Sequence, residues 1–186
     1  VVGYRDLAVA QALAARGAVG GFFVTRHNVA DKNAADVRAE LIGLRAMASR
    51  HLWIATDQEG GGVSRLSPPL PRPGLLSAVV AQYVDAGQRE QAIRAYAQAK
   101  GQGLAALGVD LNFAPVVDLD HQVVNPNDRY TRIVERAIGA DPALVAAAGR
   151  SYCQALASTG VRCTLKHFPG IGRVYNDRRV ESAAVS

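Results

Sequence analysis

Polar side chains that could bind or transform a ligand follow each of four short apolar runs in the sequence. These segments are Thr25-Arg26-His27, Asp57-Gln58-Glu59, Asp118-Leu119-Asp120-His121 and Lys166-His167. Asp accepts hydrogen bonds, whereas Lys and Arg donate them in fixed directions, so this set suits a neutral ligand rich in hydroxyl groups, such as a sugar. The alternative is structural, because strands leave a core somewhere and become polar there. That alternative explains one such segment better than it explains four.

Two glycine-containing turns follow two of these segments, and neither has the spacing of a nucleotide-binding loop. Gly60-Gly61-Gly62 follows the first carboxylate pair, and Phe168-Pro169-Gly170-Ile171-Gly172 follows the Lys-His pair. A run of glycines lets the backbone approach a ligand closely, but the sequence has neither the GxGxxG nor the Walker pattern. Cys and His also lack the spacing of a zinc site. The sequence therefore predicts neither a metal nor an organic cofactor.

Alternating helix and strand patterns would position these segments. Helices are expected over about 5–16, 37–48, 85–107 and 141–157, and strands over 20–25, 52–56, 109–114 and 161–165. Gly17 and Gly160 predict helix ends, and Asp141 with Pro142 predicts a helix start. Gly101 and Gly103 are expected to weaken the end of the third helix. The four prolines of residues 67–74 indicate an irregular loop. Apolar strands alternating with helices predict a parallel sheet, whose carboxyl ends share one edge.

Length and composition favour one packed domain. The 186 residues are 49% hydrophobic and 20% charged, which supports a single domain over residues 1–186 rather than disorder. No apolar run reaches the roughly 18 residues of a membrane span, and no targeting peptide is visible at Val1. These features predict a cytoplasmic protein, and they leave a periplasmic or exported one open.

The net charge of +5 is concentrated toward the end of the sequence. Residues 161–186 contain five bases and two acids. A local basic rim favours an anionic ligand, and a solvated basic terminus is an equally good interpretation. Nucleic-acid binding normally needs a longer basic stripe with interleaved aromatic residues. Neither a nucleic acid nor a membrane is therefore expected as a partner.

The two cysteines, Cys153 and Cys163, are too few for a disulfide scaffold. A free cysteine behaves as a small apolar side chain and is commonly buried. We therefore expect both to be buried free thiols.

Three motifs, taken together, resemble glycoside hydrolase family 3, and in particular its NagZ-type bacterial β-N-acetylhexosaminidases, which act in peptidoglycan recycling. They are Asp57-Gln58-Glu59-Gly60-Gly61, Asn112-Phe113-Ala114-Pro115-Val116-Val117-Asp118 and Lys166-His167-Phe168-Pro169-Gly170. The resemblance implies an α/β fold, a TIM (β/α)8 barrel that is incomplete here, with about four βα units. The first barrel strand is then expected before Val1 and three more after Ser186. Open strand edges need a partner, so a barrel fragment is expected, with a self-sufficient smaller α/β domain as the alternative.

The resemblance also implies five substrate-binding residues. Asp57 would bind sugar hydroxyls at the non-reducing end, and Lys166 and His167 would bind ring hydroxyls. Arg65 matches a substrate-binding arginine of the family, and Arg136 matches the arginine of its ERSF-like segment. The alternative for His167 is a structural histidine.

The chain departs from the family at the general acid/base, which the family carries as Asp-Ser-His on a loop. Asp177 aligns with the aspartate, but Arg179 stands at the histidine position. Arginine, with a pKa above about 12, cannot exchange a proton at neutral pH. Ile171 also replaces a histidine of the family, and Gly62 replaces an arginine. The family's nucleophile, an aspartate after a later strand, would lie beyond residue 186.

Two functions from different classes follow from the resemblance. The first is hydrolysis of terminal β-linked N-acetylglucosamine or a related sugar, with a variant loop or a residue beyond the chain supplying the proton chemistry. The second is a catalytically impaired sugar-binding homologue, in which Arg178 and Arg179 add positive charge and favour an anionic muramyl-type sugar. A carbohydrate is the expected partner in both.

Overall fold

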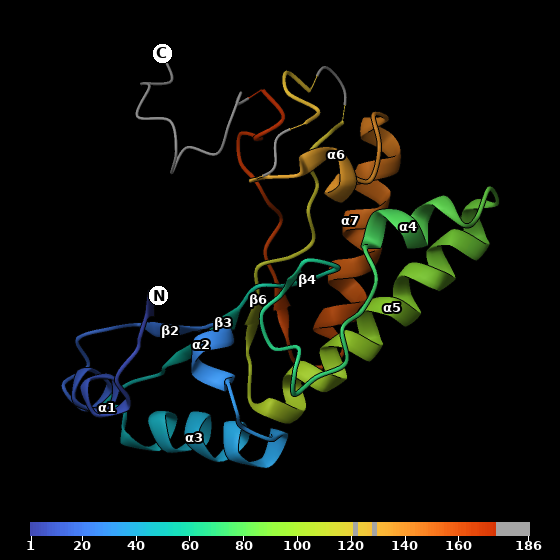
Figure 1. Ribbon diagram of the computed structural model, residues 1–186. Helices are drawn as coiled ribbons and strands as arrows, with labels where there is room; N and C mark the ends of the chain where they lie inside the picture. Colours follow the sequence, from blue (N-terminus) through green and yellow to red (C-terminus); the bar gives the residue numbers. More distant parts are fainter. Residues whose placement is uncertain (121–122, 128–129, 174–186) are drawn as a thin grey trace.

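The central sheet is parallel, and its strands lie side by side in sequence order (Figure 1). The computed structural model describes residues 1–120, 123–127 and 130–173. Each strand pairs in parallel with the next, without a reversal of direction or order. The five strands are β1 (Val2–Gly3), β2 (Gly21–Val24), β3 (Trp53–Thr56), β6 (Leu111–Asn112) and β7 (Arg162–Cys163).

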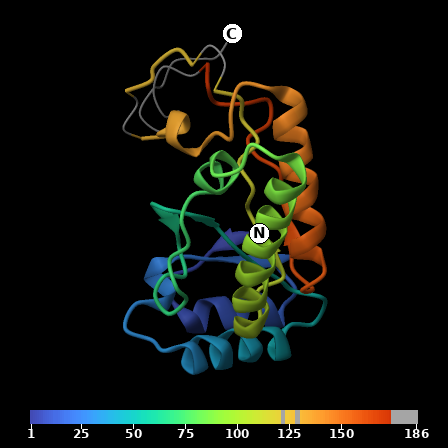
Figure 2. The same ribbon diagram turned by 90° about the vertical axis from the view of Figure 1, so that its right-hand side faces the viewer.

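Four crossover helices connect these strands and follow one another around the sheet (Figures 1 and 2). The first packs on the second, the second on the third, and the third on the fourth. Crossover connections between parallel strands are right-handed. When the strands also follow one another in sequence order, every helix lies on the same face of the sheet, as in a barrel. In a doubly wound sheet the strand order reverses, and helices cover both faces. The fold is therefore an incomplete (β/α)8 barrel. The helices are α1 (Leu7–Ala15), α3 (Ala34–Met47), α5 (Ala86–Leu107) and α7 (Pro142–Ala157).

The crossover helices begin and end where local side chains satisfy their free backbone groups. Each begins after an Asp or Asn whose side chain accepts a hydrogen bond from a backbone N–H of the first turn. Asp141 performs this role for α7, as predicted. Gly17 and Gly160 have positive φ angles of 61° and 85° just beyond the ends of α1 and α7, which confirms them as helix ends.

α5 continues as a helix through Gly101 and Gly103 to Leu107, which confirms the predicted extent of this helix. A Cβ atom at Gly101 would lie 2.2 Å from Thr159 Oγ1 and 3.0 Å from Leu156 Cδ1. The glycine therefore lets α5 approach α7 and the turn after it. The low helix propensity of glycine can be seen in the sequence, whereas its packing against α7 cannot.

The sheet has one more strand than the sequence predicted. The first barrel strand was expected before Val1, but Val2 and Gly3 pair with Phe22 and Phe23. An exposed strand of two residues contains no apolar run that could reveal it. The sequence analysis also missed other short elements: α2 (Arg26–Val29), the antiparallel hairpin of β4 (Gln58–Gly60) and β5 (Val63–Ser64), α4 (Leu76–Ala81) and α6 (Ile133–Arg136).

Strand and helix side chains share one buried apolar cluster. Phe22 and Ile54 of the sheet are fully buried, as are Leu44, Leu104 and Leu156 of the crossover helices. This cluster fixes each helix against the sheet and so fixes the loops at the strand ends. Within the described ranges, the structure contains no helix long and apolar enough to cross a membrane.

Arg162 lies at the opposite end of β7 from Lys166. Its guanidinium carbon is 5.0 Å from the centre of the Trp53 ring, at the first residue of β3. The interpretation of residues 161–186 as a single basic rim is therefore wrong for Arg162. A count of charges along the chain cannot tell which end of a strand each charge reaches.

The two cysteines form a disulfide bond, so the prediction of buried free thiols is wrong. Cys153 lies on α7 and Cys163 on β7, with their Cα atoms 5.4 Å apart. The chain turns back from α7 into β7 between them, which places the two side chains opposite each other. The number of cysteines alone could not reveal this geometry.

Removal of this disulfide should lower the free energy of unfolding by about 2–3 kcal/mol, because the bond restricts a short loop in the unfolded chain. The comparison is between the natural full-length chain and its Cys153→Ala/Cys163→Ala variant in urea unfolding. Reductant should lower the midpoint of the wild type and leave that of the double variant unchanged. A wild-type midpoint that does not respond to reductant would contradict the assignment.

Candidate active site

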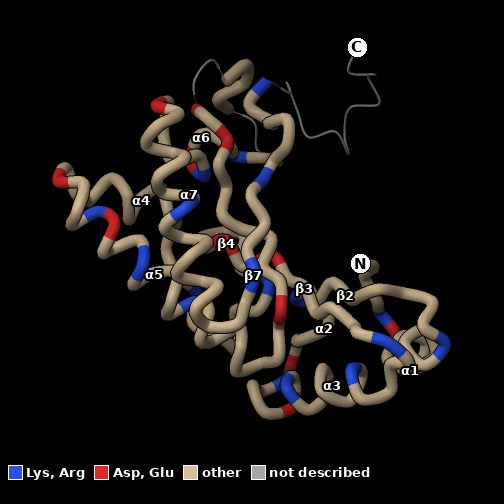
Figure 3. The backbone as a smooth tube through the Cα atoms, turned by 180° about the vertical axis from the view of Figure 1, so that it is seen from behind, with Lys and Arg blue, Asp and Glu red and all other residues tan. Residues whose placement is uncertain are grey.

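The segments after β3 and β7 bring Asp57, Glu59 and Lys166 together at the carboxyl edge of the sheet. Lys166 Nζ lies 2.5 Å from Asp57 Oδ1 and also contacts the Glu59 carboxylate. All three side chains are less than one-fifth exposed. Figure 3 shows basic and acidic positions close together around β4 and β7. The convergence of these segments, which the parallel sheet predicted, is confirmed.

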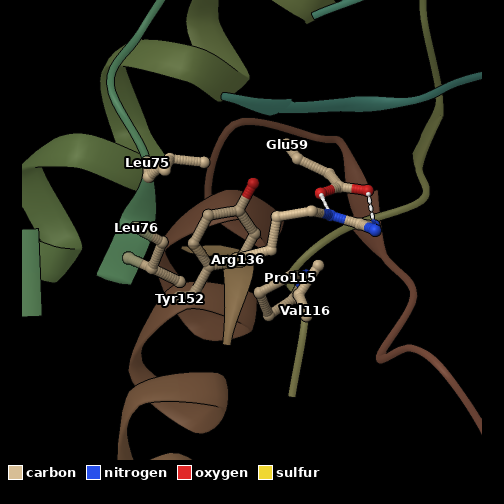
Figure 4. Close-up of a pocket in the computed structure, with 7 residues that line it drawn as sticks. All are labelled: Glu59, Leu75, Leu76, Pro115, Val116, Arg136 and Tyr152. Carbon is tan, nitrogen blue, oxygen red and sulfur yellow. Dashed lines mark hydrogen bonds and ion pairs between the residues drawn. The ribbon is translucent and has the colours of Figure 1, made fainter. Parts of the chain in front are cut away.

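Arg136 of α6 completes this cluster by binding both oxygens of Glu59 (Figure 4). Its Nε lies 2.8 Å from Glu59 Oε2, and its Nη2 lies 2.7 Å from Oε1. Arg136 Nη1 also donates to the carbonyl oxygen of Thr131 at 2.7 Å. Two parallel hydrogen bonds to one carboxylate fix direction as well as distance. The guanidinium plane is therefore set by Glu59.

His167 is oriented by Asp118, which follows β6. His167 Nδ1 lies 2.6 Å from Asp118 Oδ2, and the backbone N–H of His167 donates to the same oxygen. The other oxygen of Asp118 accepts from the N–H of Ile171 at 2.7 Å. The Nε2 atom of His167 lies 3.4 Å from Arg136 Nη2. Since arginine only donates, this contact fits a histidine that carries its proton on Nδ1 and accepts at Nε2.

Arg65 lies beside Asp57, just after the β4–β5 hairpin. Its backbone N–H donates to the carbonyl oxygen of Asp57 at 3.2 Å. Its charge also acts on Asp57, favouring the ionised carboxylate. The five residues that the resemblance implied for substrate binding thus lie in one neighbourhood, with Arg65 at its border.

The three acids of the site differ in the direction of their pKa shifts. Burial raises the pKa of Asp57 and outweighs the opposing charge of Lys166. Burial alone would raise the pKa of Glu59 too, but the hydrogen bonds from Arg136 and the charge of Lys166 lower it below its usual value. The hydrogen bonds from His167 and Ile171 likewise outweigh burial and lower the pKa of Asp118. Glu59 is therefore an anion that holds Arg136 and Lys166 in place, and Asp118 is an anion that orients His167.

A narrow pocket opens beside the Glu59–Arg136 pair (Figure 4). The ion pair forms one side of it, and the other residues that line it are Leu75, Leu76, Pro115, Val116 and Tyr152. Its volume is about 10 Å³, which is room for about one water molecule, so this pocket borders the ion pair and does not itself hold a sugar.

The sequence analysis gave no individual role to several residues that support this site. Glu59 and Asp118 stand inside the quoted motifs, and that position was the available signal for them. Asn112 also stands inside one of these motifs. Its side chain accepts a hydrogen bond from the N–H of Gln58 at 2.9 Å and donates one to the carbonyl oxygen of Gln58 at 3.1 Å. These two bonds fix the main chain of Gln58, the residue between Asp57 and Glu59.

Tyr96 and Lys100 of α5 also support the site, because both contact the carbonyl oxygen of Glu59. The sequence carries no signal for this role, since polar residues on a helix are usually solvated.

The residues of the altered acid/base segment, Asp177, Arg178 and Arg179, lie outside the described residues, as does His121. Their roles stay predictions. The described part of the site is the set of groups suited to binding.

Comparison with known proteins gives a family and several relatives. The family model for the glycosyl hydrolase family 3 N terminal domain matches residues 1–186. A protein named Beta-hexosaminidase from Xanthomonas oryzae pv. oryzae is 40% identical over 164 residues, which are 87% of this chain and 44% of that relative. The chain thus spans less than half the length of this curated relative.

Solved structures show the same relationship. A glycoside hydrolase family 3 beta-N-acetylglucosaminidase from Paenibacillus sp. str. FPU-7 has a TM-score of 0.79 and 30% identity, over 95% of this chain and 32% of that one. NagZ from Neisseria gonorrhoeae, in complex with N-trifluoroacetyl-D-glucosamine, has a TM-score of 0.80 and 27% identity, over 95% of this chain and 52% of that one. The chain belongs to glycosyl hydrolase family 3, and its residues are those of the N-terminal domain of that family.

Proposed function

We propose that the natural protein is a glycosidase that removes terminal β-linked N-acetylglucosamine, or a related sugar, and serves carbohydrate metabolism and peptidoglycan recycling. The observation that carries this proposal is the cluster of Asp57, Glu59, Arg136 and Lys166 at the carboxyl edge of the sheet. The names of the relatives support it, since they are a Beta-hexosaminidase and a beta-N-acetylglucosaminidase. The Neisseria structure adds a glucosamine derivative as a ligand of this fold.

The five candidate residues have complementary roles in sugar binding. Asp57 accepts hydrogen bonds from hydroxyl groups at the non-reducing end, while Lys166, Arg136 and Arg65 donate. His167, held by Asp118, presents Nε2. A fixed set of donors and acceptors of this kind distinguishes the hydroxyl pattern of one sugar from that of another. We also propose that residues 1–186 form a single domain, a partial barrel.

Catalysis needs groups beyond this binding set. Retaining hydrolysis uses a nucleophile and a general acid/base, and we place the nucleophile outside these 186 residues. Asp177 is the proposed acid, although Arg179 replaces its histidine partner. Without a substitute for that partner, loss of acid/base assistance would slow the reaction by about 10²- to 10⁴-fold.

Turnover of a chromogenic N-acetylglucosaminide by the natural full-length chain tests the proposal. The matched substrate is the corresponding glucoside, which lacks the acetamido group. Preferential release from the N-acetylglucosaminide is the expected result. Sugar affinity without turnover would instead indicate the impaired homologue, and an absence of both would contradict a sugar site.

Asp57→Ala should weaken the affinity for N-acetylglucosamine by about 1–3 kcal/mol, because buried hydroxyl groups lose a charged acceptor. Calorimetric titration of the full-length chain measures this. Asp36→Ala is the control, since Asp36 is an exposed aspartate in the first turn of α3. Equal affinities in wild type and Asp57→Ala would remove Asp57 from the site.

Cellular location and the finer choice of sugar rest on separate observations. A disulfide persists in oxidising surroundings, so the Cys153–Cys163 bond favours the periplasm or the cell exterior over the cytoplasm that the sequence predicted. An anionic muramyl-type ligand is the finer proposal for the sugar, and it depends on Arg178 and Arg179 in the sequence.

A further inference from the structure

Lys100 is a buried lysine in α5 that contacts the main chain of Glu59. Only 7% of its surface is exposed. Its Nζ atom lies 2.5 Å from the carbonyl oxygen of Glu59 and 2.8 Å from the hydroxyl oxygen of Tyr96. It also lies 4.1 Å from the centre of the Tyr96 ring and 5.3 Å from that of Tyr152. Lys100 thus holds a main-chain carbonyl group, whereas Lys166 holds side-chain carboxylates.

Glu59 is held at both of its ends. The hydroxyl of Tyr96 lies 2.8 Å from the Glu59 carbonyl oxygen and 2.7 Å from that of Gly74, so α5 contacts the Glu59 main chain through two side chains. Arg136 and Lys166 hold the carboxylate. A shift of the Glu59 main chain would therefore carry the carboxylate with it and change the placement of both cations.

The surroundings of Lys100 are mainly apolar. The residue borders a mainly apolar cavity of about 200 Å³, whose other lining residues are Gln58, Leu70, Pro71, Pro73, Tyr96, Ala99 and Gly103. The ionisable groups that face its amino group are the Glu59 carboxylate on β4, Tyr96 on its own helix and Tyr152 on α7. The loop of residues 67–74 contributes only Leu70, Pro71 and Pro73 here, and none of them can be ionised.

We propose that Lys100 is a positioning residue of the sugar site, which holds the main chain of Glu59 and thereby sets the placement of Arg136 and Lys166. This inference rests on the proposed function, because Arg136 and Lys166 are the residues proposed to bind the sugar. Lys100 acts through Glu59 and does not contact the sugar.

The charge of Lys100 connects this role to pH. Burial lowers the pKa of Lys100 to about 7, against the opposing effect of the Glu59 carboxylate. The ammonium form therefore predominates below about pH 7 and the neutral amine above it. A hydrogen bond from an ammonium group is stronger than one from a neutral amine. Sugar affinity should accordingly be highest below pH 7 and fall as the pH rises through that value.

The test compares the dissociation constant of N-acetylglucosamine for the full-length wild type and Lys100→Met, from about pH 5 to about pH 9. Methionine is similar in length to lysine and brings no charge into the protein interior, so the fold should tolerate it. At low pH the variant should bind about tenfold more weakly than the wild type. Its affinity should also lose the transition near pH 7. Lys32→Met is the control, because Lys32 pairs with Glu40 near α3, remote from the site.

Tyr96→Phe gives a second variant that keeps the lysine. It should weaken binding and retain a transition near neutral pH, whereas a merely structural effect of Lys100→Met would leave the pH profile unchanged. Lys100→Met with the affinity and pH profile of the wild type would overturn the proposal.

A measurement without sugar separates this inference from the proposed function. The carbon-13 signal of the Glu59 carboxylate should shift with a midpoint near pH 7 in the wild type and not in Lys100→Met. Absence of that shift in the wild type would also overturn the role of Lys100. Failure of the wild type to bind N-acetylglucosamine at any pH would instead contradict the proposed function.

Discussion

Glu59→Gln should lower the free energy of unfolding by about 3–5 kcal/mol, because it leaves buried cations without their carboxylate. The Glu59 side chain is 5% exposed and that of Arg136 is 12% exposed, so water can replace little of the lost charge. Lys166 keeps Asp57 as a partner, whereas Arg136 keeps the carbonyl oxygen of Thr131 and the 3.4 Å contact with His167 Nε2, neither of which is a carboxylate. Urea unfolding of the full-length chain at neutral pH measures the difference.

Glu135→Gln is the matched control for this experiment. Glu135 pairs with Arg132 within the same short helix region, but both side chains are more than half exposed. An exposed ion pair contributes about 0–1 kcal/mol, so this variant should unfold close to the wild type. Similar losses from the two substitutions would show that burial does not set the strength of the Glu59 pair.

The loss caused by Glu59→Gln should depend on pH in a defined direction. The pKa of Glu59 in the folded protein lies below its ordinary value of 4.5. The stability that its ionised form contributes is therefore complete above pH 4.5 and is lost as the pH falls toward the folded-state pKa. The gap between wild type and Glu59→Gln should narrow in acid. A gap that widens there would contradict the assignment of Glu59 as a stabilised anion.

The sequence predicted the frame of the site well because the signals for it are local. Apolar runs and capping residues such as Asp141 located the longer helices and the central strands, and parallel pairing then required Asp57 and Lys166 to meet. Contacts made between elements left no comparable signal. The Cys153–Cys163 bond, the close approach at Gly101 and the main-chain hydrogen bond of Lys100 all depend on distances across the fold.

The glycine run after Glu59 shows this limit at a single position. Sequence reasoning assigned Gly60-Gly61-Gly62 to a close approach between backbone and ligand. In the structure Gly60 instead approaches the protein itself: a Cβ atom there would lie 2.1 Å from the carbonyl oxygen of Gly74 and 2.6 Å from the hydroxyl of Tyr96. The residue type was informative, but the neighbour that required it could not be predicted.

Gly60→Ala should therefore be the most disruptive change within this run, with a loss of about 3–5 kcal/mol in unfolding free energy from backbone strain and overpacking. Gly60 has a φ of 124°, a backbone conformation that residues with a side chain rarely adopt. A methyl group there would also meet the carbonyl oxygen of Gly74 and the hydroxyl of Tyr96, which are hydrogen-bonded to each other, and the same hydroxyl contacts the Glu59 main chain. Affinity for N-acetylglucosamine should fall in the same variant, because the displaced residue follows Glu59 directly.

Gly62→Ala provides the comparison within the same three residues. The nearest heavy atom to a Cβ atom at Gly62 is Arg132 Nη1 at 3.9 Å, an ordinary contact distance. This variant should unfold within about 1 kcal/mol of the wild type, since alanine fits there and restricts the unfolded chain. The measurement compares the urea unfolding midpoints of Gly60→Ala and Gly62→Ala in the full-length chain, and Gly60→Ala should have the lower midpoint. Equal midpoints would mean that the turn after Glu59 adapts to a side chain, and the approach of Gly74 and Tyr96 to Gly60 would then not be what fixes Glu59.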